Sequence, residues 1–529
     1  MKAATFFALC LSCIAWATDI KVTASAEDLI TAHAVALSQD CVQTCRDAAA
    51  QGNAEAACKL SAHYLNQNAE QWQEGARWAI KAAEMGSAQG AMLAGSCYYD
   101  GRGVVKNASQ AAAYFNRAYE LGNTRVLKAL AHIYAHGEGV PADAEKAMRF
   151  AQAAVKENIP HALSSLAIMY AKGVGTTIDF ARAKELMQQA IDQAPQEGQL
   201  YHILACIHIL ETDEHWDKTV PLFQKAAALG WASSYLPLAV AYQTGKGTEQ
   251  DNAKAFWYAE RAVDAGLPGA YFHMAEMYRE GVGTEKDPNK ASDFYQQAIE
   301  QNPSHAESYL GLAEVLQNMT QGHEADAEIV QLLEKAAECG DTYAMQILAV
   351  EYSEAGGLSE INIEGYAKWC CTAAALGADW ALLPAVAMHV QQCSVNMNDD
   401  QALQYCLTAV EKKLPGALAS LAACYTSGTF TEQNLPEAER LFRESIAREP
   451  DQTAAYAGLA KCIMLQRNNE EAELEAFLLL QKGAECGDPA SIDMMAEAYE
   501  TGRAFANGKR LPADAEKAQM YYNLAEKSD

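Results

Sequence analysis

The chain has 529 residues, with 40 Lys and Arg against 68 Asp and Glu, so its formal net charge is −28. No basic block interrupts this acidic composition, which argues against a nucleic-acid backbone as the ligand. Proline is scarce and the glycines are spaced rather than clustered, which excludes collagen and long disordered linkers. Much of the hydrophobic half of the chain is alanine, and this favours many shallow helix contacts over a few thick cores.

The N-terminal segment has the features of a secretory signal peptide. Lys2 precedes an apolar stretch from Phe6 to Ile14, which is too short to span a bilayer, and Ala15 and Ala17 supply the small residues that signal peptidase needs. We predict cleavage after Ala17 and export to the periplasm or the extracellular space; the alternative is an uncleaved N-terminal anchor. No later segment is long and apolar enough to predict a membrane span in the mature chain.

Thirteen of the fifteen cysteines follow this segment, an odd number, so at least one is expected to be unpaired or to pair between chains. An oxidising destination allows disulfides. Helical-hairpin geometry predicts two candidate pairs, Cys45 with Cys58 and Cys406 with Cys424, and Cys393 competes for the second pair. The alternative is that most of these cysteines are small, buried helix residues.

An internal period of 36 residues organises the chain. A Gly-x-Gly step recurs at spacings of 36 or 72 residues, and a tyrosine precedes each step by three positions. An Asp or Asn follows the second glycine by four, and two rows of alanine share the register. The interval around residue 209 keeps only one alanine row, so we predict a degenerate repeat there. The recurring residues are Tyr98, Gly101, Gly103, Tyr134, Gly137, Gly139, Tyr170, Gly173, Gly175, Tyr242, Gly245, Gly247, Tyr278, Gly281 and Gly283.

Each row has a physical reason. Leu130 and Tyr134 are four residues apart and share one helical face. Gly137 suits the left-handed residue that ends a helix, and Asp143 suits the N-cap of the next helix. Ala147 then begins the buried stripe of that helix. Each unit is therefore predicted to be a helix, a Gly-x-Gly turn, a second helix and a stop.

Beyond residue 302 the period loosens to 36–38 residues, although Tyr352 and Tyr425 keep the first-helix aromatic. We expect about thirteen units in all. The predicted organisation is a signal peptide, an N-terminal helical cap, regular repeats, degenerate repeats of the same solenoid, and a C-terminal repeat and cap, at residues 1–17, 18–52, 53–302, 303–487 and 488–529, respectively.

The combined pattern resembles the Sel-1-like repeat, a relative of the tetratricopeptide repeat. Its Lys-Ala step is matched at Lys146-Ala147, Lys254-Ala255 and Lys290-Ala291. The resemblance is strong over 87–302 and 488–529 and weaker between them. It implies an all-α fold, a right-handed superhelical solenoid of antiparallel helix pairs. It also implies scaffold or adaptor work, because family members commonly hold partner proteins together.

Stacked helix pairs offer a long groove rather than a deep pocket, and this favours binding of a protein or peptide over catalysis. The groove of such solenoids is usually lined by the first helices. The candidate lining residues lie off the core stripe of these helices: Lys128, His132, His136, Ser165, Ile168, Met169, Phe272, His273 and Glu276. For each of them, ordinary solvated surface is the simpler interpretation.

The search for chemistry is negative, and we predict no catalytic residue, cofactor or metal. His132 and His136 have a spacing that can bind zinc, but they are not part of an HExxH motif. The Gly-x-Gly steps follow helices rather than strands, which excludes a dinucleotide-binding loop. We therefore predict a non-enzymatic, exported scaffold whose oligomeric state the sequence leaves open.

One alternative function stays open at this point, a cell-wall-associated enzyme or regulator that binds peptidoglycan or β-lactams. It comes from the resemblance, since some cysteine-rich secreted members have been linked to penicillin-type ligands. The chain has no SxxK and no KTG sequence, so a serine β-lactamase mechanism lacks its nucleophile.

Overall fold

A computed structural model describes residues 37–212, 215–319, 326–353, 362–393, 397–450, 453–467, 469–506 and 509–525. The predicted signal peptide lies outside these residues. The contacts divide the chain into two units, Met1–Phe294 and Tyr295–Asp529, and the division falls inside one helix, α17 (Pro288–Gln301).

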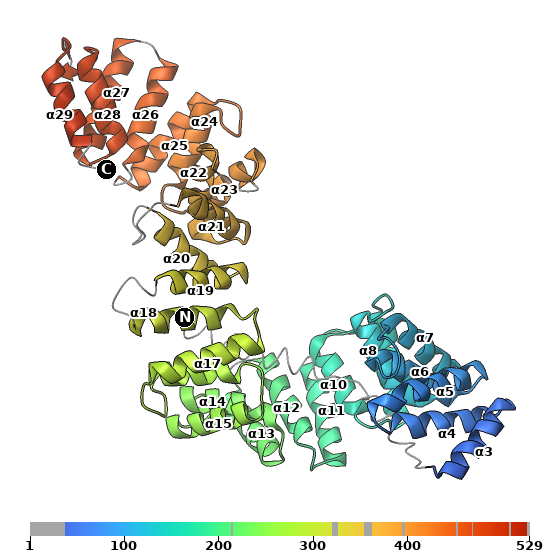
Figure 1. Ribbon diagram of the computed structural model, residues 1–529. Coiled ribbons are helices and arrows are strands. Elements are labelled where there is room, and N and C mark those ends of the chain that lie inside the picture. The colour runs from blue at the N-terminus through green and yellow to red at the C-terminus, as the bar shows by residue number, and fades with distance from the viewer. Residues whose placement is uncertain are drawn as a thin grey trace. The chain divides into compact units, whose positions relative to one another are not determined.

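In the first unit, helices follow one another in pairs (Figure 1). A single helix, α3 (Gln39–Ala50), precedes the first pair and lies within the predicted cap. The paired helices are α4 (Ala54–Leu65) and α5 (Trp72–Glu84), α6 (Ala88–Asp100) and α7 (Ala108–Glu120), α8 (Leu127–His136) and α9 (Ala144–Lys156), α10 (Ala162–Lys172) and α11 (Phe180–Gln193), α12 (Gly198–Glu211) and α13 (Trp216–Ala228), and α14 (Tyr235–Thr244) and α15 (Asn252–Asp264); α16 (Ala270–Glu280) and the start of α17 follow.

The second unit continues the same pattern from the end of α17. Its helices are α18 (Ala306–Met319) and α19 (Asp326–Glu338), α20 (Thr342–Tyr352) and α21 (Ile363–Ala375), α22 (Leu382–Val390) and α23 (Asp399–Glu411), α24 (Ala417–Ser427) and α25 (Leu435–Arg448), α26 (Ala454–Gln466) and α27 (Glu470–Glu485), and α28 (Pro489–Glu500) and α29 (Ala515–Ala525). A short antiparallel hairpin, β1 (Phe505–Ala506) and β2 (Lys509–Arg510), occupies the long loop before α29, with Phe505 opposite Arg510.

The described residues thus form thirteen helix pairs, from α4–α5 to α28–α29, and the predicted all-α repeat fold is confirmed. The interval that lacks Gly-x-Gly is the pair α12–α13, so it is a degenerate repeat and not a break. Short 3-10 helices precede α5, α8, α14 and α22. None of the described helices has the length and apolar character needed to cross a membrane.

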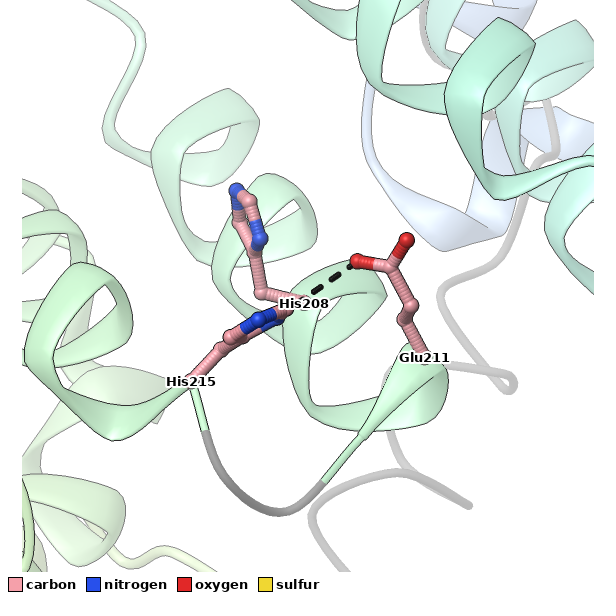
Figure 2. Close-up of side chains that lie close together, drawn as sticks. All are labelled: His208, Glu211 and His215. Carbon is pink, nitrogen blue, oxygen red and sulfur yellow. Dashed lines mark ion pairs between the residues drawn. The ribbon is translucent and has the colours of Figure 1, made fainter.

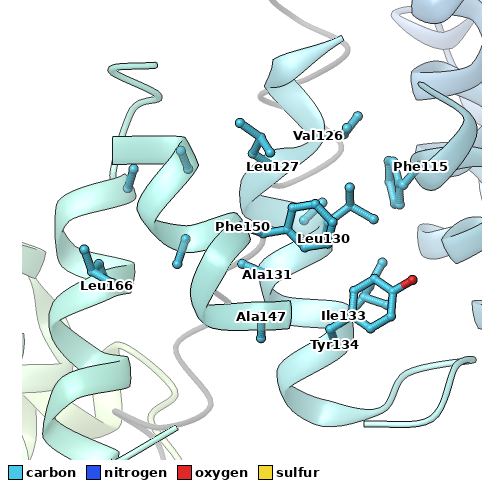
Figure 3. Close-up of a cluster of buried hydrophobic side chains, with 14 of the residues drawn as sticks. Phe115, Val126, Leu127, Leu130, Ala131, Ile133, Tyr134, Ala147, Phe150 and Leu166 are labelled. Carbon is cyan, nitrogen blue, oxygen red and sulfur yellow. The ribbon is translucent and has the colours of Figure 1, made fainter. Parts of the chain in front are cut away.

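Buried side chains of successive helices join into continuous cores because no helix pair can cover its own apolar face. Around α8 (Figure 3), Leu130 is fully buried between Phe115 of α7 and Phe150 of α9. Alanines such as Ala131 and Ala147 let neighbouring helices approach closely. This is the pattern of many shallow contacts that the composition predicts.

The tyrosine that ends each first helix packs on the second helix of its own pair. Tyr242 stacks on Tyr258 with ring centroids 5.7 Å apart, and Tyr278 stacks on Phe294 at the same distance. The lysine of the Lys-Ala step lies over this tyrosine, and its Nζ is 4.0 Å from the ring centroid in the pair of Lys146 and Tyr134. Similar pairs occur at Lys254, Lys290 and Lys517. A cation–π contact thus explains why lysine recurs at this step.

The two glycines of each turn have different roles. The first ends the first helix in the left-handed conformation, as predicted, and Gly137 has a φ of +69°. The second lies against the preceding repeat, since a Cβ built on Gly247 would be 2.2 Å from the carbonyl oxygen of Trp216, the first residue of α13. The same close approach to the start of a preceding second helix recurs at Gly103, Gly139, Gly175 and Gly283. The second glycine is therefore required for contact between repeats.

Candidate functional site

The first helices of the first unit carry one position that repeat packing leaves variable. It is occupied in five successive pairs by the residues that we call the first-helix row: His132, Ile168, Leu204, Val240 and Glu276. Leu204 and Val240 are buried, whereas the other three are half-buried and retain accessible surface. The row therefore combines apolar and polar side chains at equivalent places of consecutive repeats.

Five of the nine predicted groove residues offer little surface to a ligand. Lys128, Ser165, Met169, Phe272 and His273 are each at most 8% exposed. The reason is that first helices are enclosed by helices of their own and neighbouring pairs, so most of their circumference is buried. The expectation of an open lining is therefore corrected at these positions. His132, Ile168 and Glu276 are half-buried, and His136 is exposed.

The histidines of α8 form a compact polar cluster. The rings of His132 and His136 have centroids 4.4 Å apart, and Nδ1 of His132 is 3.7 Å from a carboxylate oxygen of Glu138. Burial lowers the pKa of His132; the nearby Glu138 opposes this effect, and Lys172 and Lys128 reinforce it. Two lysines and one carboxylate thus lie near His132 at this end of the first-helix row, although the chain as a whole is strongly acidic.

A pocket of about 370 Å³ lies where the α9–α10 turn meets the end of α11 and the start of α12. His161 Nδ1 is 3.3 Å from Glu197 Oε2 in its wall, and His161 has left-handed backbone geometry, with a φ of +59°. Asn158, Gln189 and Gln193 add amide groups, so the lining mixes polar and apolar side chains. Its lining is Val155, Asn158, Ile159, Pro160, His161, Ala162, Leu163, Gln189, Ala190, Gln193, Ala194, Glu197 and Leu200.

A group of potential metal ligands lies at the turn of the degenerate repeat, and the sequence analysis missed it. His208 and Glu211 come from the end of α12, and His215 immediately precedes α13 (Figure 2). One ligand atom of each of these residues lies within 4.8 Å of the others, and all three residues are half-buried. The available signal was the spacing H-x-x-E-x-x-x-H at the turn, which places the first two side chains one helical turn apart.

This triad has a defined electrostatic setting. Lys184 of α11 donates to both carboxylate oxygens of Glu211, at 2.9 and 2.7 Å, and this contact lowers the pKa of Glu211. Nδ1 of His215 is 3.6 Å from Glu211 Oε2. Burial, followed by Lys184, lowers the pKa of His208. The carboxylate is thus held ionised, and the imidazole of His208 is held neutral, the form that binds metals.

All thirteen cysteines in the described part of the chain are free thiols. Cys406 and Cys424 are buried in one core cluster, and a hydrogen bond between them raises the pKa of Cys406 and lowers that of Cys424. Cys45 and Cys58 share a smaller cluster, but the Cys58 thiol lies 3.2 Å from the Ser87 hydroxyl. Both disulfides remain predictions, and the structure places the second pair in contact.

Comparison with known families matches the Sel1 repeat model to ten segments, which together cover more than half of the chain: residues 54–87, 88–123, 127–158, 160–195, 233–267, 268–303, 330–341, 415–449, 454–488 and 495–529. The chain belongs to the Sel1 repeat family. Sel1 repeat solenoids are typical of protein-interaction scaffolds. The pair α12–α13, which bears the triad, falls between two matched segments.

Two solved structures are similar to this Sel1 repeat chain. A protective antigen of uropathogenic Escherichia coli strains, which displays an SLR fold, is 22% identical, and the match covers 88% of this chain and 94% of the antigen with a TM-score of 0.42. A Sel1 repeat protein from Oxalobacter formigenes is 24% identical, and the match covers 60% of this chain and 92% of that protein with a TM-score of 0.45. Comparison with curated protein sequences gave no match.

Proposed function

We propose that this Sel1 repeat protein is an exported, non-enzymatic scaffold that binds a protein or peptide along the first-helix row of its first unit. One observation carries the proposal. The positions that stack the repeats keep one residue type, whereas the row changes from His132 through Ile168 to Glu276 and stays accessible at all three. In repeat proteins, residues that stacking does not fix are available to specify a ligand.

The charges along the first-helix row indicate which charged and apolar groups a ligand would carry. At α8, burial lowers the pKa of His132, Glu138 opposes this effect, and Lys172 and Lys128 add to it, so two lysines and one carboxylate lie near this end of the row. At the other end, Glu276 pairs with Arg279 at 2.6 Å on α16. A ligand with an acidic segment near α8 and an apolar side chain near Ile168 matches this order.

Site-specific crosslinking tests the proposal. A photoreactive amino acid is placed at Ile168, and in a matched control at Arg149, which is exposed on the second helix α9. The native partner is expected to crosslink through position 168, and Ile168→Asp is expected to weaken the Kd of the purified pair about 10-fold or more, as for a central contact. Crosslinking through 149 alone, or an unchanged Kd for Ile168→Asp, would contradict the assignment.

The export component is tested separately. N-terminal sequencing of the protein from its native host is expected to begin at Thr18, the residue after the predicted cleavage site. A cytoplasmic chain that retains Lys2 would refute export without affecting the proposed binding surface.

A further inference from the structure

At its turn, the degenerate repeat has residues of types that can bind metals, where the neighbouring repeats have residues that stabilise the turn. Counting in steps of 36, Glu211 takes the place of the second turn glycine, which is Gly175 one repeat earlier. His215 takes the place of the N-cap Asp179. His208 occupies the position at which the neighbouring first helices, α10 and α14, end, whereas α12 continues to Glu211.

These replacements do not strengthen the local fold. Asp179 accepts a hydrogen bond from the backbone N–H of Arg182, whereas His215 makes no capping bond with its side chain. The ion pair with Lys184 can explain the presence of Glu211, because Lys184 stands where the preceding pair has Met148, an apolar residue that packs beneath the turn. It does not explain the histidines. Neither change explains why two histidines flank this carboxylate.

The imidazoles themselves point to a ligand. Nδ1 of His208 and Nδ1 of His215 are both buried and make no hydrogen bond within the described part of the chain, and the charged group near His215 Nδ1 is Glu211 of the same cluster, at 3.6 Å. The rings meet edge to face with centroids 6.1 Å apart, and Figure 2 shows them close together near the Glu211 side chain. Buried polar nitrogens without a hydrogen bond are costly, and a cation that accepts their lone pairs would remove that cost.

We propose that His208, Glu211 and His215 bind a divalent transition metal ion of the Zn²⁺ type at the α12–α13 turn. Two histidines and one carboxylate form a common three-residue ligand set for such ions, and they leave a further position for water or a ligand. Tetrahedral coordination at about 2.0–2.2 Å places donor atoms about 3.4 Å apart. Donors that already lie within 4.8 Å reach this spacing through side-chain rotation.

Lys184 is compatible with this site because a carboxylate has two oxygens. It contacts both in the structure. Metal binding through one carboxylate oxygen leaves the other oxygen for Lys184, so the ion pair and the metal can share Glu211. The lysine's positive charge still opposes the cation, so the site is expected to bind more tightly when Lys184 is replaced by an uncharged residue.

The test uses the full chain with its thiols alkylated, because Cys41, Cys339 and Cys486 are exposed and would bind the same ions. Co²⁺ is titrated while its visible d–d bands are recorded, and Zn²⁺ is then added to displace it. The wild type is expected to bind one equivalent with the strong bands of tetrahedral Co²⁺, and Zn²⁺ is expected to remove them.

Variants separate this site from adventitious binding. His208→Gln and His215→Gln should each weaken the Kd for Co²⁺ about 10- to 100-fold or more, since loss of outer-shell groups alone has effects of that size. His136→Gln, the matched control two repeats upstream, should leave the Kd unchanged. An equal effect of His136→Gln, or no effect of the other two, would overturn the proposal.

The Lys184→Met variant tests whether weaker Co²⁺ binding in a variant of this turn results from loss of folding. It should leave the Kd unchanged or tighten it several-fold, which an unfolded variant would not do. Weakening as large as that of His208→Gln would show that the turn is an ion-pair network, and the metal site would be rejected. Zn²⁺ should also raise the Tm of the wild type and not that of His208→Gln.

Discussion

The contrast between the two turn glycines gives a quantitative prediction. Gly245 and Gly247 both have left-handed backbones, with φ of +72° and +67°, so alanine at either one carries the same conformational cost, about 1–2 kcal/mol. A Cβ at Gly245 makes only ordinary van der Waals contacts, the nearest of them with Gln250 at 3.4 Å. A Cβ at Gly247 lies 2.2 Å from the Trp216 carbonyl oxygen, so α13 must move by about 1 Å, which adds about 1–3 kcal/mol.

Hydrogen exchange is the appropriate assay because repeat arrays open locally rather than in one step. Gly247→Ala is expected to lower amide protection across α13 and α14 about 10-fold more than Gly245→Ala, since each 1.4 kcal/mol is a factor of ten. Equal losses in the two variants would show that backbone conformation alone accounts for both glycines. A loss spread evenly over the first unit would refute the contact with Trp216 as the cause.

Three further predictions concern acid stability, capping and oxidation. Burial lowers the pKa of His202 and His273 to about 4, so an unfolded chain, with histidine near 6.5, binds more protons between pH 6.5 and 4. The free energy of unfolding should thus be highest above pH 7 and fall by roughly 3 kcal/mol per histidine by pH 4. Melting curves without this loss would contradict the burial of His202 and His273. Asp143→Ala should cost about 1 kcal/mol in denaturant unfolding and Asp143→Asn much less, because the side chain caps α9 with a 2.8 Å bond to the backbone N–H of residue 146; equal costs would rule out capping. A small-molecule disulfide oxidant should join Cys406 to Cys424, with loss of two hydrogens in peptide mass mapping, and two separately modified thiols would refute the predicted pair.

The sequence predicts the repeat fold in detail because the same local contacts recur in the regular repeats. Gly137 is left-handed and Asp143 caps α9, as each residue type predicts. A single alanine row was enough to identify α12–α13 as a degenerate pair. These features depend on interactions within a few residues or with the adjacent repeat, so periodicity alone reveals them.

The candidate site was predicted less well because it depends on packing from several directions. One helical stripe shows which face is apolar, but it does not show that Lys128 and Phe272 are enclosed from the other side as well. The triad was missed because its ligands span a turn, and because Lys184, which sets their charge, comes from a separate helix. Spacing within one helix cannot show such a convergence.

The contact of the second turn glycine with the backbone of the preceding repeat affects how the number of repeats can change. Each repeat with a Gly-x-Gly turn carries its own contact point on the repeat before it, as at Gly283 on Asn252 and Gly175 on Ala144. When one whole 36-residue period is deleted or duplicated, the glycine still lies against an equivalent carbonyl, and the contact between repeats is preserved. A partial period would place a side chain against that backbone instead. Evolution or engineering can therefore lengthen and shorten the array in whole repeats, each adding or removing one position of the first-helix row.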